Sequence, residues 1–521
     1  MRNITFVFIF LAYLAQAQVN LSASQLDFGD VLTTTDKELA VNVTNTSSGP
    51  LVIDDVNVYN TDFTYSIPSA TIATGATEKI RVTFKPRHNL AYNTELIFVL
   101  DDGSEHRIDL IGNGRYEGTY YSSTFNKSHQ DLKDALKTKL ASGYTNLGYN
   151  GARDKMYGDI DNVNGKVTGV YTGKVETMST RAQANSVGIN CEHTWPQSLF
   201  SSNEPERADI HHLFPTDVSA NSRRANYPFG EVSNASWTEG GSKLGGNVFE
   251  PRDVQKGATA RAMLYFAIRY QDYSNFIDGQ EAILKQWHID NQPTAWDIQR
   301  NEKIFGYQKN RNPFVDHPEF IERINKIGST DTKPVIKSAE TAQSSLNFKY
   351  VDPTAERSVF IVNTGNQNIT GISAVTARDG NIIVNSIGAN ANVGEAAEII
   401  LGFKNLPDGT YTDELTINLQ SQVSKTITIP VTFTIGAVSV NEVVYNKIKT
   451  NYNPANQLLT ILEAPADIQH VEIWDAAGKQ IILNDISSSL TDIPFGGHSQ
   501  GVYFVVIKTK TEVFTSKVLV Y

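Results

Sequence analysis

The alternation of apolar and polar residues changes along the chain and divides it into segments. Residues 18–113 contain short runs, such as 39–43 and 80–84, in which apolar and polar side chains alternate between Gly, Pro, Asn and Asp. A period of two predicts half-buried β-strands, and many short strands predict a β-sandwich. Residues 331–437 have the same texture. Residues 441–521 form a third β-rich segment, with strands predicted at 458–461, 470–474, 501–507 and 514–520.

The first two of these segments are related in sequence. Leu-Asp-Phe at 26–28 recurs as Leu-Asn-Phe at 346–348, and Val-Thr-Asn-Thr at 43–46 recurs as Ile-Val-Asn-Thr at 361–364. Internal repetition at a nearly constant spacing predicts two copies of one structural unit. The two segments resemble immunoglobulin-like (Ig-like) modules, for which a spacer role without chemistry is the leading interpretation.

The segment between the two repeats, residues 114–330, has a different periodicity. Apolar residues recur at helical spacing in 130–137 and again in 258–270. We therefore expect a multidomain protein in which a central α+β domain lies between two all-β sandwiches, followed by a C-terminal all-β domain. The central domain is the candidate for catalysis.

The N-terminal residues predict export. Met1-Arg2-Asn3 precedes an apolar run and then Ala15-Gln16-Ala17, which is the pattern of a cleaved signal peptide over residues 1–17. No later segment approaches the length of apolar chain that a transmembrane helix needs. The prediction is a secreted or cell-surface protein with no transmembrane segment in its mature chain, acting as a monomer.

The richest chemistry lies in the central segment, between residues 190 and 226. Glu192, His193 and Asn221 supply a carboxylate, an imidazole and a carboxamide, from which a metal-assisted hydrolytic site can be built. The pattern predicts a strand that ends at Glu192-His193, a strand over 209–214, and a helix that Thr216 caps. Strand alternation would then place His211 and His212 on opposite faces, so that only one faces the site.

Two other chemistries use the same residues. Cys191 is the only cysteine, so no intramolecular disulfide forms; as a nucleophile it would depend on His193, whose position two residues away is poor for proton exchange. A zinc site could combine Glu192, His193 and the two later histidines, but no His-Glu-x-x-His helix occurs and a thiolate cage is excluded. His211 and His212 are each better interpreted as hydrogen-bonded structural histidines.

The central segment closely resembles the endonuclease I family of secreted or periplasmic non-specific nucleases, whose core is a ββα-metal (His-Me) finger. The resemblance rests on motifs spread over the segment: Cys191-Glu192-His193 with Trp195-Pro196, Asp209 with His211-His212-Leu213 and Pro215, Asn221 with Arg224 and Asn226, and the stretches 170–173, 260–265 and 308–318. It implies that His193 is the general base and that Glu192 and Asn221 bind a metal ion. Asp209, His211 and Asn226 would support the site or the fold.

The implied ligands suit a particular ion. One carboxylate, one amide oxygen and several waters match Mg²⁺, which keeps much of its hydration shell, with Mn²⁺ or Ca²⁺ as substitutes. A phosphodiesterase also needs a cationic side chain near the phosphate. Arg224 and Arg311 are our candidates for this catalytic role, and Arg207 and Arg223 are alternatives.

Charge bears on the substrate. The chain has 45 basic and 56 acidic side chains, a net charge of −11, but the central segment holds equal numbers of each, so the excess lies in the flanks. A sequence-specific binder more often shows a basic face. We therefore expect cleavage of DNA, RNA or both with little sequence preference. The alternative is a surface adhesion protein whose central domain is a degenerate nuclease; the intact Glu192, His193 and Asn221 set argues against it.

Residues 441–521 carry a second resemblance. The motifs at 453–455, 471–479, 501–504 and 517–520 are similar to the C-terminal sorting domain of the type IX secretion system. The resemblance implies that the type IX secretion machinery is a partner and that the chain crosses the outer membrane. A small sandwich that stays attached is the competing interpretation.

Overall fold

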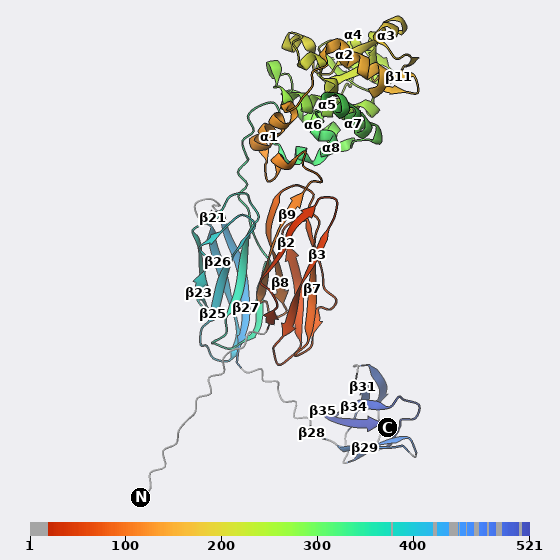
Figure 1. Ribbon diagram of the computed structural model, residues 1–521. Helices are drawn as coiled ribbons and strands as arrows, with labels where there is room; N and C mark the ends of the chain where they lie inside the picture. Colours follow the sequence, from red (N-terminus) through yellow and green to blue (C-terminus); the bar gives the residue numbers. More distant parts are fainter. Residues whose placement is uncertain are drawn as a thin grey trace.

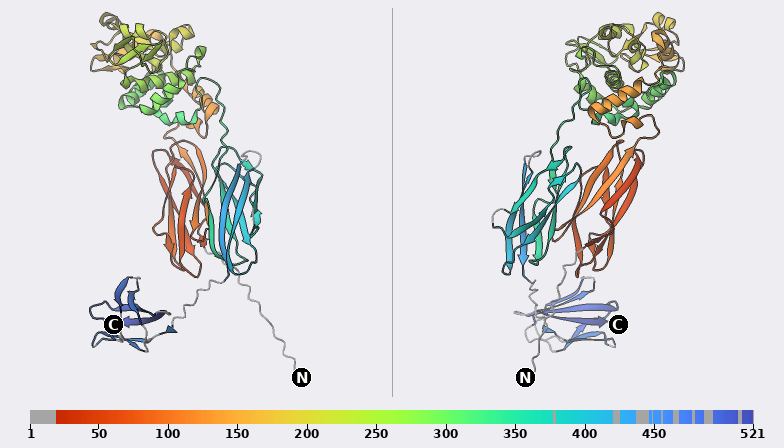
Figure 2. Two further views of the ribbon diagram at one scale, coloured as in Figure 1. Left: turned by 180° about the vertical axis from the view of Figure 1, so that it is seen from behind. Right: turned by 60° about the vertical axis from the view of Figure 1, so that its left-hand side comes forward.

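The computed structural model describes residues 19–376, 379–419, 425–436, 446–447, 449–454, 456–462, 468–476, 479–485, 492–509 and 513–520. The predicted signal peptide, residues 1–17, lies outside these residues. Two β-sandwiches lie side by side, the central domain of helices and small sheets lies beyond one end of them, and a β domain follows at the C-terminus (Figures 1 and 2). No helix in the described ranges is long and apolar enough to span a bilayer.

The first sandwich is built from two sheets, with strand orders β1-β3-β7-β5 and β2-β9-β8-β4-β6. Phe28, Phe63 and Phe84 are buried between the sheets, with the last two rings stacked at 4.5 Å. The strands are β1 (Val19–Leu21), β2 (Gln25–Leu32), β3 (Lys37–Asn45), β4 (Leu51–Val58), β5 (Phe63–Ser66), β6 (Thr71–Ile72), β7 (Thr77–Phe84), β8 (Ala91–Leu100) and β9 (Glu105–Arg115).

The second sandwich repeats this topology, with strand orders β18-β20-β25-β23 and β19-β27-β26-β22 and a short β21-β24 pair. In both copies the second strand pairs in parallel with the last strand through a shifted register. Its strands are β18 (Ala339–Thr341), β19 (Leu346–Val351), β20 (Arg357–Asn363), β21 (Ile369–Thr370), β22 (Ile372–Thr376), β23 (Ile382–Ile387), β24 (Asn390–Ala391), β25 (Ala396–Phe403), β26 (Gly409–Leu419) and β27 (Lys425–Ile435).

One asparagine in each copy makes the same hydrogen bonds. Asn45 Nδ2 donates to the carbonyl oxygens of Gly49 and Ile72, and Asn363 Nδ2 donates to those of Gln367 and Ala391. Both asparagines are buried, where an unpaired amide would be costly. The matching hydrogen bonds and topology confirm the predicted relationship between the two segments.

The sandwiches pack against each other through an apolar patch and two buried carboxylates. Ile97, Phe360 and Val362 form the patch. Glu105 accepts a hydrogen bond from the backbone N–H of Phe360 at 2.8 Å, and Glu95 accepts one from that of Ala396 at 3.0 Å. Burial raises the pKa of Glu105 to about 7, against the hydrogen bonds that favour its charged form. Burial also raises the pKa of Glu95, although Arg107 opposes that shift.

We expect Glu105→Gln to stabilise the paired sandwiches above neutral pH. A carboxyl group with a raised folded-state pKa contributes stability below its unfolded value of 4.5 and loses it as pH rises through about 7. The glutamine should therefore raise the free energy of unfolding at pH 8 by about 3 kcal/mol, or several degrees in melting temperature, and change little at pH 4. Calorimetry of the full chain measures this, with the exposed Glu340→Gln as control; equal effects at both pH values would contradict the prediction.

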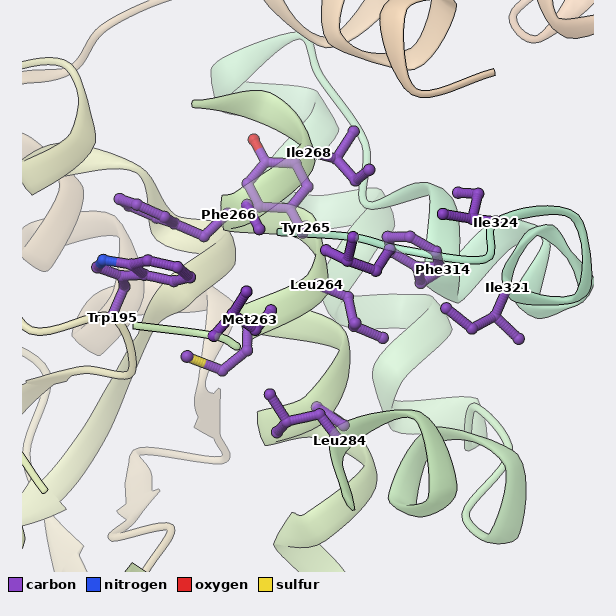
Figure 3. Packing of buried hydrophobic residues seen from close by; sticks show 14 of the residues in the cluster. Trp195, Met263, Leu264, Tyr265, Phe266, Ile268, Leu284, Phe314, Ile321 and Ile324 are labelled. Carbon is purple, nitrogen blue, oxygen red and sulfur yellow. The ribbon is translucent and has the colours of Figure 1, made fainter. Parts of the chain in front are cut away.

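The central domain is organised around helix α5, whose side chains are buried along nearly its whole length. A helix that is buried on all sides lies inside a domain. Trp195 stacks on Phe266 of α5 at 4.7 Å, and Met263, Leu264 and Tyr265 of the same helix belong to the same buried cluster (Figure 3). The helices are α1 (His129–Ala141), α2 (Gly148–Lys155), α3 (Arg181–Val187), α4 (Val218–Arg224), α5 (Asp253–Arg269), α6 (Glu281–Asp290), α7 (Ala295–Gln308) and α8 (Pro313–Asp316).

Short elements fill the rest of this domain. The strands are β10 (Asn162–Val163), β11 (Lys166–Thr168), β12 (Val175–Thr177), β13 (Ile189–His193), β14 (Leu213–Asp217), β15 (Trp237–Glu239), β16 (Ser242–Gly245) and β17 (Val248–Glu250). The short helical turns are η1 (Ser122–Thr124), the π-helix η2 (Met156–Ile160), η3 (Gln197–Phe200), η4 (Glu206–Ala208), η5 (Ile210–His212), η6 (Tyr273–Asn275) and η7 (Pro318–Arg323). The helices predicted over 130–137 and 258–270 are present as α1 and α5.

Polar contacts hold the central domain against the end of the first sandwich. His88 Nε2 lies 3.1 Å from Glu322 Oε2, and Arg323 donates to Asn89 Oδ1 at 2.5 Å and to the carbonyl oxygen of Thr124 at 3.0 Å. Arg323 is buried, so these bonds satisfy a guanidinium that water does not reach. The central domain is therefore attached to the sandwich by these polar contacts as well as by the covalent chain.

The C-terminal β domain has two sheets, β28-β35-β34-β31-β32 and β29-β30-β33. The four strands predicted in this segment correspond to β30, β31, β34 and β35. The strands are β28 (Asn446–Lys447), β29 (Lys449–Asn453), β30 (Leu458–Leu462), β31 (His470–Asp475), β32 (Gln480–Asp485), β33 (Asp492–Pro494), β34 (Gly501–Lys508) and β35 (Val513–Val520).

Candidate active site

Strands β13 and β14 and helix α4 form the predicted β, β, α unit. The two strands are antiparallel, with Glu192 opposite Phe214 and His193 opposite Leu213. β13 ends at His193, as predicted. The predicted cap is wrong by one residue: Asp217, not Thr216, caps α4, because its carboxylate accepts the Ala220 N–H at 2.7 Å. An aspartate at this position also suits the positive end of the helix dipole.

The strand predicted over 209–214 is wrong. Residues Ile210–His212 form the turn η5, and the strand begins only at Leu213. The cause is Asp209, whose carboxylate accepts the backbone N–H of His211 at 3.1 Å and so favours a turn over a strand. Strand alternation therefore does not separate the two histidines. Both are buried, and their Nε2 atoms donate to the carbonyl oxygens of Asn310 at 3.1 Å and Glu206 at 2.6 Å.

Glu192 is buried and held by two side chains on one of its oxygens. Tyr171 donates its hydroxyl to Oε1 at 2.7 Å, and Arg224 Nε lies 3.4 Å from the same atom. Burial raises the pKa of Glu192, and Arg224 and Tyr171 oppose that effect. Among the described residues Oε2 has no hydrogen-bond partner, so the second oxygen is free to accept a further ligand.

His193 lies at the end of β13 in a nearly dry environment. Its ring is 5.3 Å from that of Tyr149 and 5.5 Å from that of His212. Burial, followed by His212, lowers the pKa of His193 well below 6.5, so the imidazole is neutral at pH 7. Nε2 lies 3.2 Å from the carbonyl oxygen of Arg207. Because a carbonyl can only accept, Nε2 carries the proton and Nδ1 keeps a free lone pair.

Asn221 projects from α4 toward the same strand. Its Nδ2 donates to the carbonyl oxygen of Cys191 at 3.4 Å, which leaves Oδ1 without a partner among the described residues. Glu192 Oε2 and Asn221 Oδ1 are thus two uncommitted oxygen atoms on neighbouring elements. They fit a hard cation that keeps several waters, such as Mg²⁺.

The two rival chemistries receive no support from the geometry. No group of three or more His, Cys, Asp or Glu side chains suited to a metal occurs in the described part of the chain, which argues against a zinc cage. Burial raises the pKa of Cys191 to about 12, although Tyr149 and Arg153 oppose that shift. The thiol therefore stays protonated at neutral pH and is a poor nucleophile.

The arginines proposed from the sequence lie in different environments. Arg224 is 1% exposed, and its guanidinium donates to the carbonyl oxygens of His193 and Thr194 at 3.3 and 2.6 Å. Arg311 donates to both oxygens of Asp316 at 2.7 and 2.9 Å, and to Glu302 at 2.6 Å. Arg224 therefore positions the end of β13, and the carboxylates neutralise Arg311. Of the alternatives, Arg223 is exposed on α4, and Arg207 lies beside His193.

The three supporting residues make structural contacts. Asp209 is fully buried and binds Arg269, Tyr265, Tyr270 and Gln308. His211 lies 4.6 Å from the Tyr265 ring. Asn226 donates to Ser198 Oγ at 2.9 Å and so joins the end of α4 to η3.

Three residues near the site had no role predicted from the sequence. Tyr171 binds Glu192, and Tyr149 with Arg153 lies near His193. Tyr171 belongs to one of the motifs that carry the family resemblance, but its partner is 21 positions away in sequence. Nothing in the local pattern around 149–153 marks it as part of a site, since short polar helices are common.

Comparisons with known proteins identify the family of the central domain. The sequence profile of the Endonuclease I family matches residues 124–319. An extracellular ribonuclease of Bacillus subtilis (strain 168) is 33% identical over 228 residues, which cover 40% of this chain and 78% of that protein. The chain belongs to the endonuclease I family. It is therefore a secreted or cell-surface nucleic-acid hydrolase.

Further relatives match parts of this chain. An extracellular ribonuclease of Bacillus amyloliquefaciens is 34% identical over 228 residues, covering 40% of this chain and 78% of that protein. An extracellular deoxyribonuclease of Aeromonas hydrophila is 28% identical over 113 residues, which cover 21% of this chain and 49% of that protein. Residues 17–113 match an Ig-like domain (HYDIN/CFA65/VesB-like), and residues 452–521 match a secretion system C-terminal sorting domain. The Ig-like and sorting-domain resemblances are confirmed.

Proposed function

We propose that this endonuclease I family member hydrolyses phosphodiester bonds in both DNA and RNA, with His193 as general base and a single Mg²⁺ ion held by Glu192 and Asn221. The observation that carries the proposal is the combination of a free Nδ1 lone pair on His193 with uncommitted oxygens on Glu192 and Asn221. Relatives named as ribonucleases and as a deoxyribonuclease support the breadth of substrate.

The residues have separate tasks in this scheme. His193 Nδ1 removes the proton of the attacking water, while the Arg207 carbonyl oxygen holds the ring by its Nε2–H. Tyr171 and Arg224 hold Oε1 of Glu192, so that its other oxygen is free and would hold the ion. A bound cation would neutralise charge on the phosphate and the leaving oxygen. Mn²⁺ and Ca²⁺ are candidates to replace Mg²⁺ because so few protein ligands are involved.

EDTA should abolish cleavage of plasmid DNA and of structured RNA, and excess Mg²⁺ should restore both. The expectation follows from a site with two protein ligands, which cannot retain its ion against a strong chelator. Agarose-gel assays of the two substrates in parallel measure it. Cleavage that persists in EDTA would remove the metal from the proposal, and absence of cleavage under all conditions would favour an adhesion protein with a degenerate nuclease domain.

Export is a further part of the proposal. The sorting domain and the predicted signal peptide together support passage through the type IX secretion machinery. We propose that the domains comprise residues 18–113, 114–330, 331–437 and 441–521, as predicted from the sequence. The paired sandwiches would then hold the nuclease domain away from the sorting domain, in line with their arrangement in Figure 1.

A further inference from the structure

Two arginine side chains without a carboxylate partner among the described residues lie over one aromatic ring beside His193. The guanidinium carbons of Arg153 and Arg207 are 4.1 and 4.4 Å from the centroid of the Tyr149 ring. That ring is itself 5.3 Å from the imidazole of His193. The three residues come from α2 and η4, and they place two positive charges next to the proposed general base.

Both guanidiniums retain unused hydrogen-bonding capacity. The Nε atoms of Arg153 and Arg207 are buried without a partner. Arg153 uses one nitrogen, Nη2, to bind Asn150 Oδ1 at 2.7 Å. In the part of the chain that the structure describes, neither arginine has a carboxylate within 4 Å, in contrast to Arg224 and Arg311. Buried donors that are cationic and unpaired are suited to an anionic ligand.

The backbone around this cluster is fixed by local contacts. Glu204 accepts the backbone N–H of Tyr149 at 3.0 Å, which joins the start of α2 to the loop before η4. The π-helix η2 follows α2 directly, and such irregular turns are frequent at functional sites. Tyr149 is half-buried, and its ring faces the two guanidiniums and His193.

We propose that Arg153 and Arg207, positioned by Tyr149, bind the substrate phosphates at the cleavage site. This inference rests on the proposed function. It identifies the cationic side chains near the phosphate, for which the sequence offered several candidate arginines. Guanidinium groups match two phosphate oxygens at once, which a lysine cannot do. Arg207 would bind close to the scissile bond, because its own carbonyl oxygen holds His193.

The salt dependence of oligonucleotide binding tests the proposal without requiring cleavage. Fluorescence anisotropy measures the binding of a labelled single-stranded DNA in EDTA, and repeated at several salt concentrations it gives the slope of log binding constant against log salt concentration. The magnitude of this slope is about 0.7 for each phosphate of the single strand that the protein neutralises. We expect Arg153→Gln and Arg207→Gln each to reduce the slope by about this amount. Arg181→Gln is the matched control, since Arg181 is paired with Asp154 at 2.6 Å on the surface.

The lysine variants separate charge from geometry. Arg153→Lys and Arg207→Lys should restore the slope, because the charge returns, but should leave kcat on plasmid DNA with Mg²⁺ below that of the wild type. Unchanged slopes in folded glutamine variants would overturn the proposal and leave the arginines with a structural role. If the wild type bound the oligonucleotide but cleaved neither DNA nor RNA, the proposed function would be wrong. The slopes would still show whether Arg153 and Arg207 bind phosphate.

Discussion

The His193→Ala variant should cleave plasmid DNA and RNA about 10²- to 10⁴-fold more slowly than the wild type, which is the usual contribution of a positioned general base. The reduction follows from the environment of the ring: Nε2 is bound to the Arg207 carbonyl oxygen, so Nδ1 is the atom available to take a proton. Single-turnover rates at saturating Mg²⁺ measure it, because they isolate the chemical step from product release.

Exogenous imidazole distinguishes a missing base from a damaged fold. It should restore part of the activity of His193→Ala, since a small base can enter the space that the side chain leaves. His106→Gln, a histidine on the first sandwich far along the chain from the site, is the matched control and should retain wild-type activity. Full activity in a folded His193→Ala would remove this residue as the base.

Elements whose conformation depends mainly on residues nearby in the sequence, or on a repeated motif, could be predicted from the sequence. Helix α5 follows from apolar residues that recur at helical spacing, and the end of β13 follows from the change of pattern at Trp195-Pro196. The paired sandwiches follow from alternation and from an internal repeat. In each case the deciding interactions lie within a few residues, or within a motif that occurs twice.

The residues that sequence reasoning placed less well depend on distant partners. The turn at Ile210–His212 replaces a predicted strand because the Asp209 carboxylate binds a local N–H and is itself held by α5. The arginines look alike in sequence, yet Arg224 binds backbone carbonyls, Arg311 binds carboxylates and the Arg207 side chain lies over an aromatic ring. Tertiary contacts, which periodicity does not reveal, separate them.

The buried carboxylate of Asp209 should contribute strongly to the stability of the nuclease domain. Its two oxygens accept from Tyr265 at 2.7 Å, Tyr270 at 2.9 Å and Gln308 at 2.9 Å, and Arg269 Nε lies 3.2 Å away. Burial alone would raise the pKa of Asp209, but Arg269 and the neighbouring histidines outweigh it and lower the pKa to about 2. The group is therefore charged at neutral pH and surrounded by donors.

Asp209→Asn should destabilise the nuclease domain by about 3–5 kcal/mol, because the substitution leaves the buried Arg269 without a counter-charge. The new amide N–H₂ would also face side chains that now donate to a carboxylate oxygen, so buried donors would lack an acceptor. Thermal unfolding of the full chain at pH 7 should show its nuclease transition lowered by on the order of 10 °C. The exposed Asp131→Asn on α1 provides a control of equal charge change, and it should unfold at the wild-type temperature.

Acid and a second substitution test the cause of this effect. A carboxylate with a depressed pKa contributes stability above its unfolded value of 3.8 and loses it as pH falls through about 2, so the difference between wild type and Asp209→Asn should shrink in that window. Adding Arg269→Met should cost less in Asp209→Asn than in the wild type, because the pair shares one interaction. Additive effects would instead assign the destabilisation to the tyrosine and glutamine hydrogen bonds rather than to the buried ion pair.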